Sequence, residues 1–292
     1  ALDRPSAYVF SPKEVWDGLQ RDDGTWLCNG LIRDWAGWQK EKGRAFVNLA
    51  AVLAALSPST AEKLLPGALT RISLNDVRDM PTLKMPYGQE VAVVHASSGM
   101  RRIISLAYFL VWCWEEHLKA KELMGEEPET KATFLIDEVE SHLHPRWQRT
   151  VIPTLLQVMS QLTASAKVQL IAITHAPVVM VSVEPMFDEQ QDAWWDLDLL
   201  RLKGHDLATV TFSRRPFVRQ GDVSRWLVSA AFDLGSARSL EAEAALQQAA
   251  LILSEQEIDH AKAKSLDATL RRLLGDTDPF WIRWRYVGER QG

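Results

Sequence analysis

The chain has 292 residues, of which 47% are hydrophobic and 24% charged, a composition that indicates a globular protein of about two domains. It excludes a disordered or collagen-like chain, and the net charge of −5 argues against a protein coated in nucleic acid without excluding a local basic groove. The two cysteines, Cys28 and Cys113, lie far apart and form neither a disulfide framework nor a CxxC zinc site, so we expect a reducing, cytoplasmic compartment.

The longest apolar run, 103–114, is too short to cross a membrane. It contains Ser105 and lies between Arg102 and Glu115, whereas a bilayer span needs about 20 apolar residues. We therefore expect a buried helix here and no membrane partner. The sequence starts without an initiator Met and without a secretory signal, so we expect it to be the later part of a longer protein.

Short elements are expected before residue 90. Ser11 and Glu14 form a capping-box pattern around Pro12, which predicts a short helix ending near residue 19. The next expected elements are a turn-rich, tryptophan-rich stretch over 22–38, a helix over 46–56, a strand over 68–74, a proline-bounded connector over 80–88 and a strand over 90–95. Both strands are expected because β-branched residues occupy alternating positions.

The centre of the chain alternates helices and strands. A helix is expected over 98–119, a strand over 132–136, a helix over 145–162 and a strand over 168–173. Both strands are apolar at nearly every position, which is typical of a parallel sheet covered by helices on both faces. Beyond residue 185 the pattern loosens into expected edge strands over 197–202 and 208–212 and helices over 222–234, 240–254 and 263–274.

Two adjacent carboxylates, Asp137 and Glu138, follow the first central strand. They would lie at the carboxyl edge of the parallel sheet, where open α/β folds bind ligands. In phosphoryl-transfer sites the first carboxylate of such a pair holds Mg²⁺ and the second polarises the attacking water. Taken alone, the pair is better explained as a strand end followed by solvated acids.

His175 follows the second central strand. Adjacent strands would place its ring near the two carboxylates, where it could bond a γ-phosphate or the attacking water. A single histidine after a strand is usually a loop residue, but its pairing with the Asp-Glu strand favours a functional role.

A third signal opens the long central helix, where Ser97, Ser98 and Gly99 precede Arg101 and Arg102. Small residues at a helix start expose backbone N–H groups, and the helix dipole adds partial positive charge, so together they favour an anion. The alternative is a plain N-cap at Ser98, with the arginines in a solvated first turn.

The order of these motifs resembles that of ABC-type ATPases. Residues 97–101 resemble their signature motif, 135–138 their Walker B motif, 140–145 their D-loop, and 174–175 their switch histidine. The stretches DEVESHLHPRWQ and ITHAPVV are most similar to the SMC-like and OLD-like AAA ATPases of prokaryotic genome-defence and retron-associated systems. The resemblance is specific from about residue 91 to residue 185 and diffuse elsewhere.

The resemblance implies an α/β fold, an ABC-type P-loop NTPase core with a parallel or mixed sheet flanked by helices. It implies a nucleotide-binding core over 91–185, a helical and strand insertion of the ATPase lobe over 1–90, and a mostly helical C-terminal region over 186–292. The implied activity is ATP hydrolysis with ATP and Mg²⁺ as cofactors. The implied partners are a second copy of the chain, an effector protein such as a nuclease in antiphage defence, and DNA.

The resemblance also implies a role for each motif residue. Asp137 would hold Mg²⁺, Glu138 would activate water, and His175 would sense the γ-phosphate. Because ABC-type sites are completed in trans in an ATP-closed homodimer, the signature residues would contact the nucleotide of the opposite subunit. These signature residues are Ser97, Ser98, Gly99 and Arg101.

One motif of that family is missing from the sequence. No segment matches G-x-x-x-x-G-K-[ST], the loop whose backbone amides cradle phosphates, and the nearest substitute, Gly43-Arg44, lacks the lysine. In this family the loop lies N-terminal to the signature, so we expect it in a preceding part of a longer protein.

Two other functions stay open at this point. The chain could be a non-catalytic scaffold, a half-domain that binds a partner or DNA without hydrolysis. It could also be an OLD-type nuclease with a C-terminal metal site among the acidic residues of 188–198. Asp196-Leu197-Asp198 matches the Asp-x-Asp element of such a site. The acidic run contains Trp194-Trp195 and lacks a clear partner strand with Gly, however, so we favour a solvated loop there.

Two further residue groups have alternative explanations. His142 and His144 with His175 suggest zinc only weakly, because no third ligand follows at metal spacing. Aromatic residues interleaved with arginine at 194–195 and 281–285 could stack on bases. We favour packing or a protein interface for these tryptophans, given the net charge of −5.

Overall fold

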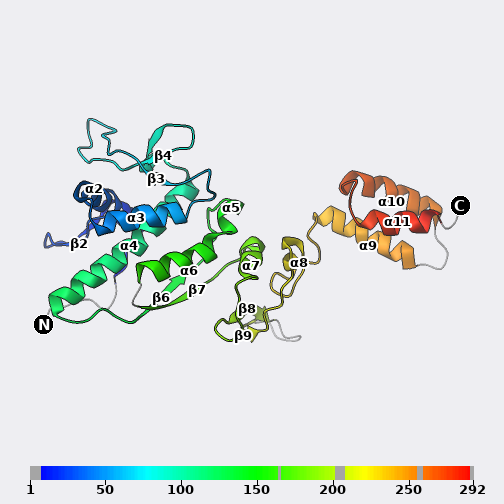
Figure 1. Cartoon of the computed structure of the whole chain (residues 1–292). Helices are drawn as coiled ribbons and strands as arrows, with labels where there is room; N and C mark the ends of the chain where they lie inside the picture. Colours follow the sequence, from blue (N-terminus) through cyan, green and yellow to red (C-terminus); the bar gives the residue numbers. More distant parts are fainter. Residues whose placement is uncertain (1–7, 164–165, 201–207, 255–258, 290–292) are drawn as a thin grey trace. The chain divides into compact units, whose positions relative to one another are not determined.

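The computed structural model describes residues 8–163, 166–200, 208–254 and 259–289, and Figure 1 shows their helices and strands. By their internal contacts the residues form two compact units, 1–193 and 194–292, which are described one at a time. The three-part division expected from the sequence stays a prediction.

The first unit opens with short helices and strands. They are α1 (Pro12–Asp17), β1 (Leu19–Gln20), β2 (Trp26–Cys28), α2 (Leu31–Glu41), α3 (Arg44–Ala55), β3 (Leu65–Pro66), β4 (Thr82–Lys84), β5 (Glu90–Ala92) and the 3-10 turn η1 (Val93–His95). The predicted capping box is confirmed, because the Ser11 N–H donates to Glu14 at 2.6 Å and the Glu14 N–H donates to the Ser11 hydroxyl at 3.3 Å. Strands β3, β4 and β5 form one antiparallel sheet, and β1 and β2 form another.

The expected turn-rich, tryptophan-rich stretch is wrong in its second half. Trp35 and Trp38 lie on α2, where both are buried in the core together with Leu31 and Ile32. Apolar residues at these spacings line one face of a helix, and burial of that face stabilises α2 over the turn that the composition suggested.

The expected strand over 68–74 is also wrong, because this stretch makes only one isolated bridge. Its apolar side chains have no surface to pack on, since Ile72 is 40% exposed and Leu74 is 100% exposed. Strand propensity depends on such packing. The sheet strand β4 lies instead within the expected connector, and the strand expected over 90–95 ends at Ala92.

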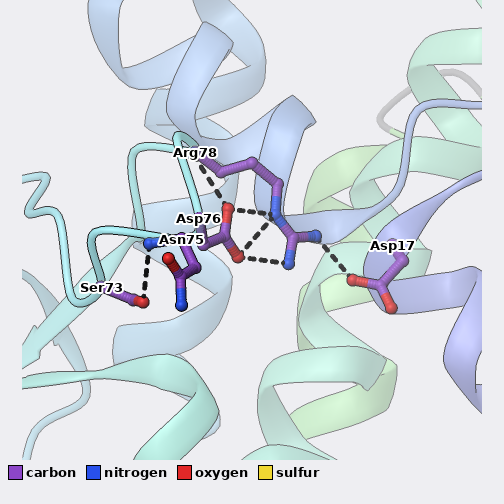
Figure 2. Close-up of polar contacts among 5 residues, drawn as sticks. All are labelled: Asp17, Ser73, Asn75, Asp76 and Arg78. Atoms are coloured by element: carbon purple, nitrogen blue, oxygen red, sulfur yellow. Dashed lines mark hydrogen bonds and ion pairs between the residues drawn. The ribbon is translucent and has the colours of Figure 1, made fainter.

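Arg78 holds the loop that follows residues 68–74 by bonding to two aspartates. Figure 2 shows the Arg78 guanidinium between two carboxylates, with Nη2 donating to Asp76 at 2.7 Å and Nη1 donating to Asp17 at 2.7 Å. Its hydrogen bonds lower the pKa of Asp76 to about 2. Because Asp17 is the last residue of α1, the loop is tied to that helix although it forms no strand.

The central elements of the first unit follow in the order expected. They are α4 (Ser98–Met124), β6 (Lys131–Ile136), α5 (Pro145–Gln148), α6 (Val151–Leu162), β7 (Lys167–Ala172) and α7 (Pro177–Val183). Helix α4 continues past its expected end at residue 119 and ends at Met124. Gly125 follows it in a left-handed conformation that suits glycine.

Polar contacts to two buried side chains of α4 hold this helix against α2 and α3. The Glu115 carboxylate is 6% exposed and accepts hydrogen bonds from Arg44 Nε at 3.1 Å and Nη2 at 2.8 Å. The Tyr108 hydroxyl donates to Asp34 Oδ2 at 2.8 Å, and burial raises the pKa of Asp34. The helix that opens with the signature-like residues is therefore anchored through its middle, at Tyr108 and Glu115.

The predicted parallel pairing in the centre is confirmed, since β6 and β7 pair in parallel over six residues each. One face of the pair packs on the core through Phe134 and Leu170. The opposite face is open among the described residues, with Leu135 68% exposed and Ile171 41% exposed. The expectation that helices cover both faces is therefore wrong for the part of the chain that the structure describes.

The single helix expected over 145–162 is divided into α5 and α6. Pro153 lies in the first turn of α6, where its missing N–H is harmless. Its ring would clash with the carbonyl of the residue four positions earlier, Arg149, if the helix ran on from α5. The chain therefore breaks at Arg149 and Thr150.

The second unit combines a hairpin with helices of 5 to 15 residues. Its elements are β8 (Trp194–Leu200), β9 (Thr209–Arg215), α8 (Val223–Leu227), α9 (Leu240–Ser254), α10 (His260–Leu273) and α11 (Phe280–Glu289). The expected edge strands are confirmed as an antiparallel pair, although residues 201–207 lie outside the described part. The helix expected over 222–234 is shorter, because only 223–227 is helical.

None of the helices in the described ranges is long and apolar enough to cross a membrane.

Candidate functional site

The ends of β6 and β7 bring the predicted acidic and histidine motifs to one edge of the sheet. Ile136 pairs with Ala172 at the last position of the two strands. Beyond it the backbones stay bonded, since the Ile173 N–H donates to the Ile136 carbonyl at 2.9 Å and the Val139 N–H donates to the Ile173 carbonyl at 3.2 Å. The loops that carry Asp137, Glu138 and His175 therefore leave the sheet side by side.

The Asp137-Glu138 pair forms a tight turn at this edge. The Glu138 N–H donates to Asp137 Oδ1 at 3.0 Å, and both side chains are exposed. Glu138 adopts a φ of 45°, a left-handed conformation that a residue with a side chain adopts at some cost. Lys42, His142 and Asp233 also have a positive φ, so this conformation does not by itself assign a function to Glu138.

The N-terminal end of α4 contacts the turn formed by Asp137 and Glu138. Arg102 Nη2 donates to the Asp137 carbonyl at 3.5 Å and to the Glu138 carbonyl at 3.3 Å. The helix is capped by Ser97, whose hydroxyl accepts from the Met100 N–H at 3.3 Å, so the alternative of a cap at Ser98 is wrong. A residue can cap only from the position before the first helical residue, and Ser98 is already helical.

The signature-like residues differ in how far they are exposed. Ser98 and Arg101 are exposed on the first turn of α4, whereas Gly99 is buried. A Cβ atom at Gly99 would lie 2.8 Å from the carbonyl oxygen of His142, which is backbone and cannot swing aside. Gly99 thus permits a close approach between α4 and the turn that follows Glu138.

Sequence reasoning missed the contacts of Glu140, which it placed only in the D-loop-like stretch. The Glu140 carboxylate accepts from the Thr174 hydroxyl at 2.6 Å and from the His175 N–H at 2.7 Å. The one feature of the sequence that pointed to these contacts was the predicted parallel pairing, which places the residues after each strand near one another. No spacing rule identifies the particular side chain.

Asp137 suits a magnesium ion by the chemistry of its donor set. Mg²⁺ is bound by one or two carboxylates and keeps several waters, and an exposed carboxylate at a strand end leaves room for such a shell. Zinc fits less well. The His144 ring accepts from the Arg146 N–H at 3.3 Å, and the described residues hold no group of three or more metal-ligating side chains.

The acidic stretch 188–198 divides at the start of β8. Asp196 and Asp198 lie on that strand, so the expected solvated loop is wrong for them, whereas the acidic residues before Trp194 are exposed and lie in no strand or helix, as expected. Asp196 pairs with Arg215 across the hairpin at 3.3 Å, and the Leu199 N–H donates to Asp198. Alternation of aspartate with large apolar residues fits a strand with two different faces.

The tryptophans of the second unit serve mainly in packing. Trp194 meets the Trp226 ring edge-on at 6.0 Å. Trp281 is 6% exposed and donates to the Gly275 carbonyl, and Trp284 donates to Asp267. Trp195 is 49% exposed and stacks on Phe212 at 4.8 Å.

Comparison with known sequences identifies the family. Residues 3–182 match the family described as "AAA domain, putative AbiEii toxin, Type IV TA system", and the chain belongs to that family. The chain is also 28% identical over 119 residues to the "Retron Vc95 probable ATPase" of Vibrio cholerae serotype O1 biovar El Tor, a match that covers 39% of this chain and 20% of the relative. It is 27% identical over 159 residues to the "Retron Ec83 probable ATPase" of Escherichia coli, covering 54% and 25% respectively.

These curated relatives are much longer than the matched stretch, which spans about a fifth to a quarter of their length. Among solved structures, the chain is similar to one from work on "ATP-driven dimerization and DNA stimulated activation of SMC ATPases". That match has 12% identity and a TM-score of 0.37, and it covers 63% of this chain and 90% of the other.

Proposed function

We propose that the chain supplies the hydrolytic and signature half of an ABC-type ATP site. The observation that carries the proposal is the meeting of Asp137, Glu138 and His175 at one end of β6 and β7, beside the first turn of α4. Membership of an AAA domain family supports ATP as the nucleotide.

Each of the three residues has its own role in this proposal. Asp137 would hold Mg²⁺, which neutralises charge on the phosphates when it is bound. Glu138 would take a proton from the attacking water, as an exposed carboxylate at the strand end can. His175 would hydrogen-bond the γ-phosphate through its ring.

The cradle for the phosphates is proposed to lie outside residues 1–292. Phosphate binding by such ATPases relies on backbone amides and a lysine of a glycine-rich loop, which the sequence lacks. The nearest substitute is already engaged in the fold, because Gly43 precedes the first turn of α3 and Arg44 is bound to Glu115.

A second copy of the chain would complete the site. Ser98 and Arg101 are exposed on the first turn of α4, where N–H groups and positive charge favour an anion. They would contact the nucleotide of the opposite subunit, so that ATP closes a homodimer and hydrolysis opens it. Ser97 and Gly99 would shape this turn through the cap and the close approach to His142.

The dimer would control an effector protein, such as a nuclease, in antiphage defence. Support for this context comes from the two relatives, each of which is named as a retron probable ATPase. DNA is a further candidate partner.

Magnesium-dependent phosphate release by the protein expressed from its complete gene tests the proposal. Asp137→Asn should lower turnover by at least about 100-fold, because loss of one group that stabilises transition-state charge costs that much. Asp276→Asn, a change at an exposed aspartate of the second unit, is the matched control. No magnesium-dependent release by the unmutated protein would instead favour the non-catalytic scaffold.

A further inference from the structure

Glu140 links two segments that lie far apart in the sequence. Its Oε2 accepts from the Thr174 hydroxyl at 2.6 Å and its Oε1 accepts from the His175 N–H at 2.7 Å. Hydrogen bonds to a carboxylate are shorter and about twice as strong as those between neutral groups. Each oxygen therefore holds one donor of the segment that leaves β7.

The Thr174 hydroxyl extends this link along the backbone. It accepts from the Ala176 N–H at 3.1 Å while it donates to Glu140. A hydroxyl that both donates and accepts polarises its neighbours, which strengthens a chain of hydrogen bonds. The backbone from Thr174 to Ala176, immediately before α7, is thus fixed at three consecutive residues.

No other hydrogen bond in the described residues joins 174–176 to the turn after β6. The backbone ladder ends with the bond from the Val139 N–H to the Ile173 carbonyl. The His175 ring is exposed, and the bonds at residues 174–176 fix the backbone from which the ring extends.

We propose that Glu140 is a positioning residue that holds His175 beside Asp137 and Glu138. The inference rests on the proposed ATPase function and assigns a role to a side chain in the same site. Both donors require an acceptor, and a carboxylate offers one to each, whereas the amide of glutamine offers a single acceptor oxygen. Glu140→Gln keeps the size of the side chain but leaves one donor without its partner.

The first measurement uses the 292-residue chain and needs no nucleotide. Amide hydrogen exchange, followed by NMR, should show a protected His175 N–H that exchanges about tenfold faster in Glu140→Gln, the effect of losing roughly 1.4 kcal/mol of hydrogen bonding. An unprotected His175 amide in the unmutated chain would overturn the contact itself.

The second measurement is ATP turnover by the protein expressed from its complete gene. Glu140→Gln and Thr174→Val should lower kcat with little change in the KM for ATP, because the histidine is displaced while the nucleotide still binds. Thr174→Ser, which keeps the hydroxyl, should restore kcat. The matched control is Thr133→Val, which removes a hydroxyl bonded to Gln169 across the same two strands but away from the edge.

The outcomes separate the two proposals. No ATP turnover by the unmutated protein would count against the ATPase function, while the exchange measurement would still decide whether Glu140 holds His175. Faster exchange with unchanged kcat would overturn the positioning role, and so would a failure of Thr174→Ser to restore kcat. An equal loss of kcat in Thr133→Val would mean that general loosening of the strand pair explains the effect.

Discussion

The guanidinium of Arg102 lies 3.3 Å from the backbone carbonyl oxygen of Glu138. This contact joins the N-terminal end of α4 to the turn that carries the candidate metal ligand Asp137 and the candidate general base Glu138. Hydrogen bonds therefore join the helix start to the strand end within a single chain. A change in the position of one is expected to move the other.

Gly99→Ala should destabilise the 292-residue chain by about 1–3 kcal/mol, because the added carbon would overpack the contact with the His142 carbonyl. Gly37→Ala on α2 is the matched control, since a Cβ atom there meets nothing within 4 Å. It should stabilise the chain by about 0.5–1 kcal/mol, because alanine suits a helix interior better than glycine. Urea denaturation measures both, and an effect of the same sign in the two variants would contradict the close packing at Gly99.

The stability of the first unit should depend on the protonation of Asp34. Burial raises the pKa of this carboxyl above its unfolded value, so the folded state favours the protonated form. The contribution of protonated Asp34 to the free energy of unfolding is fully present below the pKa of aspartate in the unfolded chain, which is about 3.9. It is lost as the pH rises through the higher pKa of the folded state. The free energy of unfolding of the unmutated chain, minus that of Asp34→Asn, should therefore fall from pH 4 toward neutrality. A difference that rises with pH would show that hydrogen bonds from Asn29 and Tyr108 outweigh burial.

Ser98→Arg should block ATP-induced dimerisation while leaving nucleotide binding by each monomer nearly unchanged. The exposed Ser98 side chain would face the nucleotide of the opposite subunit, where an arginine is too large. Light scattering of the protein from its complete gene, with and without a non-hydrolysable nucleotide, gives the mass. A normal ATP-induced dimer in this variant would contradict the proposal that Ser98 contacts the nucleotide of the opposite subunit.

Residues 1–292 alone should not bind ATP appreciably, because they lack the glycine-rich loop and lysine that hold phosphates. Exposed carboxylates repel a triphosphate unless a cation lies between them. Titration of the chain with labelled nucleotide and Mg²⁺ measures this. Micromolar binding would mean that the phosphate cradle lies within these residues.

The sequence was sufficient to predict the parallel strands, because the centres of β6 and β7 are apolar apart from Thr133 and Gln169, and a parallel register places the ends of the two strands together. It was not sufficient for 68–74, where alternation without a buried face forms no strand. Nor did it show that Leu135 is exposed, because an apolar run does not say how many faces are covered. The contacts of Glu140 depend on side-chain geometry between two loops, which periodicity does not report.

The most direct test of the ATPase site is Glu138→Gln in the protein expressed from its complete gene. Glutamine preserves the shape of the side chain but cannot take a proton from water, so turnover should fall at least about 100-fold while ATP stays bound in a closed dimer. Glu122→Gln, at an exposed position near the end of α4, is the control. Steady-state phosphate release measures turnover, and nucleotide that stays with the protein measures binding. The proposed site predicts that Glu138→Gln loses turnover but keeps the nucleotide, while Glu122→Gln turns over normally. Turnover by Glu138→Gln equal to that of the unmutated protein would contradict it.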